Sequence, residues 1–252
     1  MAIKALFIDL GDTFRIVDSS SPKTFEARKR LVEICKSDMD PNAFYDYLNE
    51  KYEPYRKWAI SYTCEAPEFY LWSRWLTPEL DKEYIAKYAK ELTYNFRMAK
   101  GERKVVKDGI DTVKELIKRG YKVGIISDLI GTIEIDEWLD NDNIRDLFCT
   151  VQQSSVTMLR KPHPALYYMA MKEAGVEPEE CVFVGDNLDR DICGAKRTGF
   201  AGTIAADYRY KAAEKLNEEN LPDCIIHEFG ELLNVLPGEG KFCPDKAERR
   251  TL

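Results

Sequence analysis

The fold is decided by a stretch near the start of the chain, Ala5-Leu6-Phe7-Ile8-Asp9-Leu10-Gly11-Asp12-Thr13. Its first four residues form a continuous apolar run, which is typical of a short strand buried on both faces of a parallel sheet. The strand ends directly at Asp9. Because open α/β sheets place their active sites at the carboxyl ends of the strands, we expect the Asp9 carboxylate to lie in a functional site.

Three later segments also place polar residues next to an apolar stretch. They are Ile126-Ser127-Asp128, Arg160-Lys161-Pro162 and Val184-Gly185-Asp186-Asn187-Leu188-Asp189-Arg190-Asp191. Around them, helical periodicity alternates with strand patterns. Helices are expected at 110–119, 132–139, 164–174 and 189–198, and strands at 121–126, 148–151, 181–184, 201–205 and 224–226. The sequence therefore predicts a doubly wound, Rossmann-like α/β fold whose parallel sheet gathers these polar groups at its carboxyl edge.

Residues 19–100 have a different character. Their apolar and aromatic residues recur at helical spacing, Pro78 after Thr77 indicates a helix start, and no strand pattern is present. We therefore expect an all-helical domain, inserted after the first strand into a core domain made of residues 1–18 and 101–236. Residues 237–252, with glycines and many charges, are expected to form a loosely held C-terminal tail.

Composition narrows the class of protein. Of the 252 residues, 44% are hydrophobic, as in a globular protein, and the net charge of −7 argues against a nucleic acid partner, which requires basic surface. The seven cysteines show no Cys-x-x-Cys spacing, which favours a reducing, cytoplasmic location. We expect no signal peptide, because the chain enters a strand almost at once, and no contact with a membrane, because no apolar run is long enough to span one.

In order and spacing, the four segments resemble the motifs of the haloacid dehalogenase superfamily, and the helical insertion resembles its type C1 cap. The resemblance implies that Asp9 is a nucleophile that forms an aspartyl-phosphate with the substrate. It also implies that Lys161 pairs with this nucleophile. The residues implied to hold the transferring phosphoryl group are Thr13, Ser127, Asp128 and Lys161.

The resemblance also implies a metal site. Its ligands would be Asp9, Asp186 and the backbone carbonyl of Gly11, with Asp191 as a second acid outside this set. Oxygen ligands of this kind suit Mg²⁺, a hard cation that binds a few carboxylates together with water and phosphate. Without a cation, bringing these negative charges together would be costly.

One position departs from the family pattern. Phosphatases of the family usually carry, two residues after the nucleophile, an aspartate that protonates the leaving oxygen and then activates water, and here that position is Gly11. A positioned acid/base contributes about 10²–10⁴ in rate. Either Asp12 takes over this role, although its side chain is expected on the other face, or the substrate brings a good leaving group or its own proton source.

The resemblance leaves three functions open. The first is a Mg²⁺-dependent phosphatase of a small phosphorylated metabolite. The second is a metal-free 2-haloacid dehalogenase, against which Asp186 and Asp191 count. The third is a binding or regulatory protein whose catalytic site has decayed, as Gly11 and Asp128 suggest.

Contacts with the rest of a substrate are harder to read from residue types. Arg15 and Arg74 are candidates for binding a substrate anion. The aromatic residues of the insertion, such as Tyr62 and Trp72, are expected to form its own hydrophobic core, because a helical bundle of this size needs buried aromatic side chains. The identity of the substrate and the oligomeric state stay open.

Overall fold

The computed structural model describes residues 2–209 and 216–250. Its centre is a six-stranded sheet in the order β5-β4-β1-β6-β7-β8, in which every neighbouring pair of strands is parallel. The apolar run that opens the chain is β1, which lies inside the sheet between β4 and β6. The strands are β1 (Ala5–Ile8), β4 (Lys122–Ser127), β5 (Val151–Gln153), β6 (Cys181–Gly185), β7 (Gly202–Ala206) and β8 (Cys224–Ile226).

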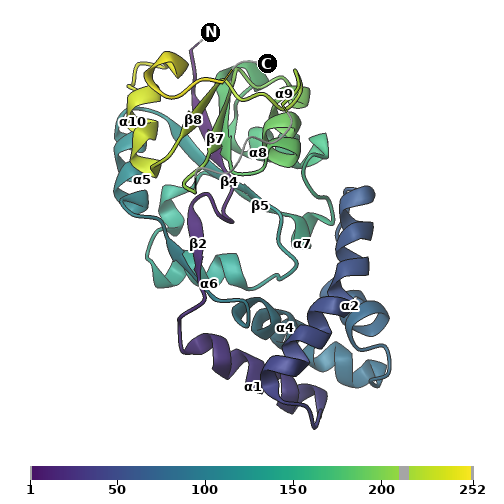
Figure 1. Cartoon of the computed structure of the whole chain (residues 1–252). Coiled ribbons are helices and arrows are strands. Elements are labelled where there is room, and N and C mark those ends of the chain that lie inside the picture. The colour runs from purple at the N-terminus through teal and green to yellow at the C-terminus, as the bar shows by residue number, and fades with distance from the viewer. Residues whose placement is uncertain (1, 210–215, 251–252) are drawn as a thin grey trace.

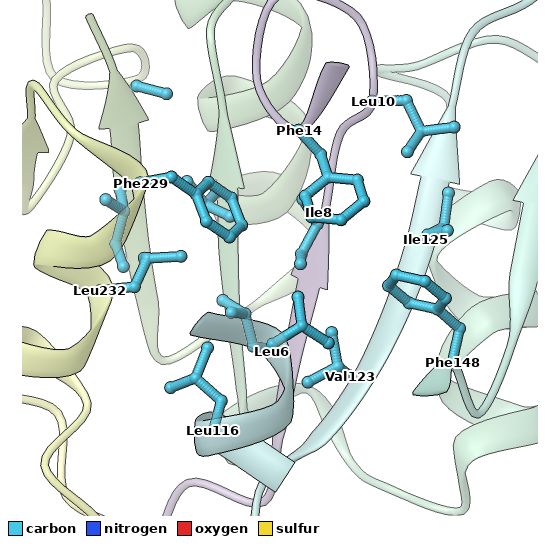
Figure 2. Packing of buried hydrophobic residues seen from close by; sticks show 14 of the residues in the cluster. Leu6, Ile8, Leu10, Phe14, Leu116, Val123, Ile125, Phe148, Phe229 and Leu232 are labelled. Carbon is cyan, nitrogen blue, oxygen red and sulfur yellow. The ribbon is translucent and has the colours of Figure 1, made fainter. Parts of the chain in front are cut away.

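Helices cover both faces of this sheet (Figure 1). On one face, Leu6 and Ile8 of β1 pack with Leu116 of α5, as Figure 2 shows. On the other face, Ala5 and Phe7 pack with residues of α8 and α9. Successive strand residues point to opposite faces, so burying both sets requires two helical layers, and the predicted doubly wound α/β fold is confirmed. The helices are α5 (Gly109–Lys118), α6 (Glu134–Asn141), α7 (Ser154–Thr157), α8 (Pro164–Ala174), α9 (Cys193–Thr198) and α10 (Leu232–Val235).

The expected helical insertion follows β2 and precedes β3. It consists of α1 (Lys23–Cys35), α2 (Pro41–Ser61), α3 (Glu68–Leu71), a π-helical turn (Trp72–Leu76) and α4 (Lys82–Met98). Its helices α1, α2 and α4 lie together in the lower half of Figure 1. Trp72 is fully buried among them, as expected, whereas Tyr62 is 70% exposed. The division of the chain into domains at residues 19 and 100 stays a prediction.

Two strands at the base of the insertion were not predicted. Strands β2 (Arg15–Asp18) and β3 (Glu102–Val105) pair antiparallel as a separate ribbon. Each is four residues long and rich in charge, so neither carries a clear strand pattern by itself. The insertion therefore begins after β2 and not directly after β1, and both ends of its chain leave the core through one ribbon.

The C-terminal segment is bound to the core, so the expectation of a loosely held tail is wrong for residues 237–250. The backbone amide of Ile3 donates to the carbonyl of Gly240 (2.8 Å), and that of Ile225 donates to the carbonyl of Glu248 (2.8 Å). The Phe242 ring packs against Gly202 on β7, where a Cβ atom would clash with it. Thr251 and Leu252 lie outside the described residues. Among the described residues, no helix has both the length and the apolar character that crossing a membrane requires.

Candidate active site

Asp9 follows β1 at the carboxyl edge of the sheet, as predicted. Its amide donates to the carbonyl of Val184 on β6 (2.9 Å), its side chain is 2% exposed, and Thr13 Oγ1 donates to its Oδ2 at 3.5 Å. Burial raises the pKa of Asp9 to about 7, against the lowering effect of Lys161. The carboxylate therefore depends on nearby cations to stay ionised. Ser127 is buried at the end of the neighbouring strand β4, and its contact with phosphate, like that of Thr13, stays a prediction.

Lys161 is the nearest cation to Asp9. Its Nζ donates to Asp9 Oδ1 (2.6 Å), to Asp191 Oδ1 (2.8 Å) and to the carbonyl of Ile126 (2.8 Å). Burial by itself lowers the pKa of Lys161, but the carboxylates of Asp191 and Asp9 outweigh burial and raise this pKa. Lys161 therefore stays charged inside the protein and is held in place by three acceptors.

Three carboxylates meet beside Lys161. One oxygen atom from each of Asp9, Asp186 and Asp191 lies within 4.8 Å of the others. This donor set fits Mg²⁺, because clustered carboxylate oxygens are the ligands that a hard divalent cation prefers. The fold thus brings together Asp9 and Asp186, and it adds Asp191, which we expected outside the ligand set. The assignment of these ligands and of the Gly11 carbonyl stays a prediction.

The backbone around β6 explains how Asp191 reaches the cluster. A π-helical turn, Leu188–Ile192, precedes α9 where the sequence predicted a regular helix. Asp191 Oδ2 accepts a hydrogen bond from the amide of Asn187 (3.1 Å). A Cβ atom on Gly185 would lie only 2.5 Å from the same oxygen. Glycine is needed at position 185 because the Asp191 carboxylate packs directly against its backbone.

Arg190 is a second cation at the cluster, for which the sequence analysis found no role. Its guanidinium lies 3.3 Å from Asp191, 3.6 Å from Asp186 and 3.6 Å from Asp128. Asp128 Oδ1 in turn accepts a hydrogen bond from the backbone amide of Lys161 (2.9 Å). The Asp128 carboxylate thus joins the loop that carries Arg160 and Lys161 to the end of β4. Its predicted contact with phosphate stays a prediction.

The turn after Asp9 leaves space at the position that lacks the usual acid. A Cβ atom on Gly11 would meet no other atom within 4 Å. Asp12 adopts a left-handed backbone with φ of 57°, and its Oδ1 forms an ion pair with Arg209 Nη2 at 3.2 Å. Arg209 therefore competes for the carboxylate that was considered as a substitute acid. The role of Asp12 in proton transfer stays a prediction.

A cavity of about 570 Å³ opens over Asp9, between the core and the insertion. Its floor comes from the ends of the core strands and its wall from α2, from α4 and from the residues that follow α4. The cavity is within the size range of small-molecule sites, about 300–1,000 Å³. Six of the described residues that line it are cations: Arg56, Arg97, Lys100, Arg103, Arg160 and Arg190.

Arg15 and Arg74, the arginines expected to contact a substrate anion, are engaged elsewhere in the protein. Arg15 is buried, its Nη1 contacts Asp142 at 2.6 Å, and its guanidinium stacks on Trp138. Arg74 stacks on the ring of Tyr70, at 4.5 Å from its centroid. Neither residue lines the cavity. Residue type alone gave no sign of these partners.

The insertion also contacts the loop that carries Lys161. The amide of Glu65 donates to the carbonyl of Met158 (3.0 Å), and the amide of Arg160 donates to the carbonyl of Thr63 (3.0 Å). The Glu65 side chain is fully buried, and its Oε2 accepts from Arg160 Nη1 at 2.5 Å and from Ser154 Oγ at 2.8 Å. The residue next to Lys161 is therefore held by the insertion.

Comparisons with curated proteins find relatives that are named phosphatases. Among curated proteins, the chain is 32% identical to glyceraldehyde 3-phosphate phosphatase of Pyrococcus furiosus over 248 residues, which covers 94% of each chain. It is 34% identical to phosphoglycolate phosphatase of Photorhabdus laumondii over 125 residues, which covers 50% of this chain and 52% of the relative.

Solved structures share the fold, and a family model gives the classification. A 2-haloacid dehalogenase from Pseudomonas syringae shares the fold with a TM-score of 0.66 at 22% identity, over 93% of this chain and 98% of that one. A HAD phosphatase from Thermococcus onnurineus does so with a TM-score of 0.60 at 20% identity, over 94% of this chain and 99% of that one. A model of the haloacid dehalogenase-like hydrolases matches residues 30–205. The chain therefore belongs to the haloacid dehalogenase-like hydrolase family, as the four motifs predicted, and it is an enzyme of the hydrolase class.

Proposed function

We propose that the protein is a Mg²⁺-dependent phosphatase of a small phosphorylated metabolite and that Asp9 forms an aspartyl-phosphate intermediate. The observation that carries the proposal is the cluster of Asp9, Lys161, Asp186 and Asp191 in and beneath the floor of the cavity. Relatives that are named glyceraldehyde 3-phosphate phosphatase and phosphoglycolate phosphatase support a phosphate ester as the substrate.

The reaction follows from the position of Asp9. Its carboxylate oxygen attacks phosphorus, a bond forms between them, and the bond from phosphorus to the ester oxygen breaks. Water then attacks the same phosphorus atom, which releases phosphate and restores Asp9. Lys161 keeps Asp9 ionised and meets the negative charge on the transferring group.

The three carboxylates of the cluster would hold the Mg²⁺ ion. When bound, this ion supplies positive charge next to the transferring oxygens. Asp9, Asp186 and Asp191 are the residues that would bind it. Lys161 and Arg190 offset the negative charge of the cluster from the protein side.

Gly11 shapes the choice of substrate. Because no acid stands two residues after Asp9, proton transfer to the leaving oxygen falls to the substrate or to solvent. Esters with good leaving groups, such as aryl and acyl phosphates, are then hydrolysed faster than alkyl phosphates. The helical insertion would serve as a cap that excludes water from the aspartyl-phosphate. A cytoplasmic location stays a prediction.

The proposal is tested by hydrolysis and by metal binding measured separately. The purified protein is assayed with p-nitrophenyl phosphate and 2-chloropropionate, with Mg²⁺ or with EDTA. Phosphate release that requires Mg²⁺ is expected, whereas chloride release that is indifferent to EDTA would make the protein a dehalogenase. In a thermal melt without substrate, Mg²⁺ at about 100 times its Kd stabilises a protein by about 2.7 kcal/mol. The shift is expected to shrink strongly in Asp186→Asn, and an equal shift in both proteins would remove Asp186 from the metal site.

A further inference from the structure

The cations that line the cavity differ in how well their charge is balanced. The two on the floor have buried carboxylate partners: Arg160 contacts Glu65 at 2.5 Å, and Arg190 contacts Asp191 at 3.3 Å. Both also lie 3.6 Å from Asp128. Carboxylates of the protein therefore offset the positive charge of both arginines.

On the wall, two arginines share one acid. Arg97 Nε lies 2.8 Å from Glu134 Oε2, and Arg103 Nη1 lies 3.8 Å from Glu134 Oε1. The Glu134 side chain is 1% exposed and does not line the cavity, so it balances the two guanidinium groups from behind. One carboxylate cannot neutralise two guanidinium groups, so this wall keeps a net positive charge.

Two further cations on the same side have no strong partner. Among the described residues, one carboxylate lies at ion-pair distance from Arg56 on α2, that of Glu53 at 3.8 Å; both side chains are exposed, and both residues line the cavity. Lys100 follows α4, and within residues 2–209 and 216–250 no carboxylate lies at ion-pair distance from its ammonium. Partial burial lowers the pKa of Lys100 and the charge of Arg103 lowers it further, whereas the charge of Asp12 raises it. Even with Asp12 and Glu53 among the lining residues, the cations Arg56, Lys100 and Arg103 lie close enough to repel one another, and a bound anion would offset this repulsion.

We propose that the cavity selects phosphate monoesters that carry a second anionic group, a carboxylate or another phosphate, and that Lys100 and Arg56 bind this group. The inference rests on the proposed phosphatase function and adds its substrate class. Neutral polar side chains, Tyr52 and Asn49, lie on the same wall and offer hydrogen bonds to the part of the substrate between the two anions.

The size and charge of the cavity agree with this class of substrate. A volume of about 570 Å³ admits a small metabolite with two anionic ends. Hydrogen bonds to charged groups are the strong ones in proteins, and arginine binds carboxylate or phosphate through two of its nitrogen atoms. A neutral tail would leave the charges of Lys100 and Arg56 uncompensated in the closed complex.

The test compares two esters that differ in the second anion. Ethyl phosphate and 2-phosphoglycolate have the same length, and the ratio of their kcat/KM values measures the selection for a carboxylate. The ratio of the kcat/KM values of propane-1,3-diyl bisphosphate and propyl phosphate measures the selection for a second phosphate. We expect each variant, Lys100→Met and Arg56→Met, to lower at least one of these ratios about tenfold, because each removes a charged contact. The arm that responds identifies the anion.

The controls separate this inference from the proposed function. Lys87→Met removes an exposed lysine of α4 that does not line the cavity, and the ratios are expected to stay as in the wild type. Ratios that are the same in wild type, Lys100→Met and Arg56→Met would overturn the inference while leaving phosphatase activity in place. No hydrolysis of any ester, p-nitrophenyl phosphate included, would overturn the proposed function and with it the inference.

Discussion

The floor and the wall of the cavity differ in how well their charged side chains are paired. On the floor, Asp9, Lys161 and Asp191 are buried. The Lys161 ammonium lies 2.6 Å from the Asp9 carboxylate and 2.8 Å from the Asp191 carboxylate. On the wall, Arg56 and Lys100 are exposed and weakly paired. Buried ion pairs on the floor hold the reacting groups in one geometry, whereas weakly paired cations on the wall are free to bind an outside anion. Under the two proposals, the core performs the reaction and the insertion selects the substrate.

The largest effect is expected on the floor, from Asp9→Asn. The amide is a poor nucleophile, so phosphate release from every ester is expected to fall by about 10⁴-fold or more, whatever the tail of the substrate. Initial rates with p-nitrophenyl phosphate and 2-phosphoglycolate measure the loss. A large loss for only one of these two esters would show that Asp9 does not perform a common chemical step.

A gain of activity is expected from Gly11→Asp, also on the floor. The added carboxyl group has room, because a Cβ atom at this position meets nothing within 4 Å. It would supply the missing acid, so hydrolysis of alkyl phosphates is expected to rise by about 10²-fold, with a smaller gain for aryl phosphates. The measurement is kcat for both classes of ester. If Asp12→Asn instead abolishes activity towards alkyl phosphates in the wild-type background, Asp12 already provides the proton.

At the contact between the insertion and the loop that carries Lys161, Glu65→Gln is expected to reduce stability. The change removes the buried charge that pairs with Arg160, and breaking a buried pair costs about 3 kcal/mol. Urea unfolding followed by tryptophan fluorescence measures the loss. Glu91→Gln is the matched control, because the Arg30–Glu91 pair is also short, at 2.7 Å, but both side chains are over 40% exposed. Similar losses in the two variants would show that burial does not set the strength of the contact.

The smallest effect is expected from salt. The Debye length falls from about 30 Å to about 10 Å when the ionic strength rises from 0.01 M to 0.1 M, which screens exposed charges far more than buried ones. The KM for 2-phosphoglycolate is therefore expected to rise a few-fold, and more than the KM for ethyl phosphate. Equal responses of the two KM values would mean that the exposed cations of the wall do not attract the substrate.

Elements with strong local signals were predicted closely. Helix α8 runs from Pro164 to Ala174 as expected, because His163 caps its first turn through Nδ1 and Gly175 ends it with a left-handed φ of 61°. Helix α4 was misplaced, since Pro78 indicated a start but the helix begins at Lys82 behind the cap of Asp81. Strand β5 was expected at 148–151 and lies at Val151–Gln153. The buried side chains of Gln152 and Gln153 hid it from an argument based on apolar runs.

The residues around the cavity likewise fall into a group that the sequence indicated and a group that it did not. Asp9, Lys161, Asp186 and Asp191 were found from sequence because each lies in one of the four motifs, close to the end of a strand or apolar stretch. The wall cations were missed because they come from helices and a ribbon without any motif. Their proposed role depends on Glu134, 37 residues from Arg97, and on the fact that, among the described residues, no carboxylate lies at ion-pair distance from Lys100. Only the folded structure shows which cations lack a carboxylate partner.

By itself, the sequence determined the parallel sheet, the carboxylates at its edge and the family of hydrolases, because apolar runs and the polar residues that follow them are local features. The tertiary structure decided that Asp128 secures the Lys161 loop, that Arg15 pairs with Asp142 and that residues 237–250 are fixed to the core. It also decided the charge of the cavity wall. Each of these depends on which distant residues meet, and electrostatic energy is set by distance and burial in space and not by order along the chain.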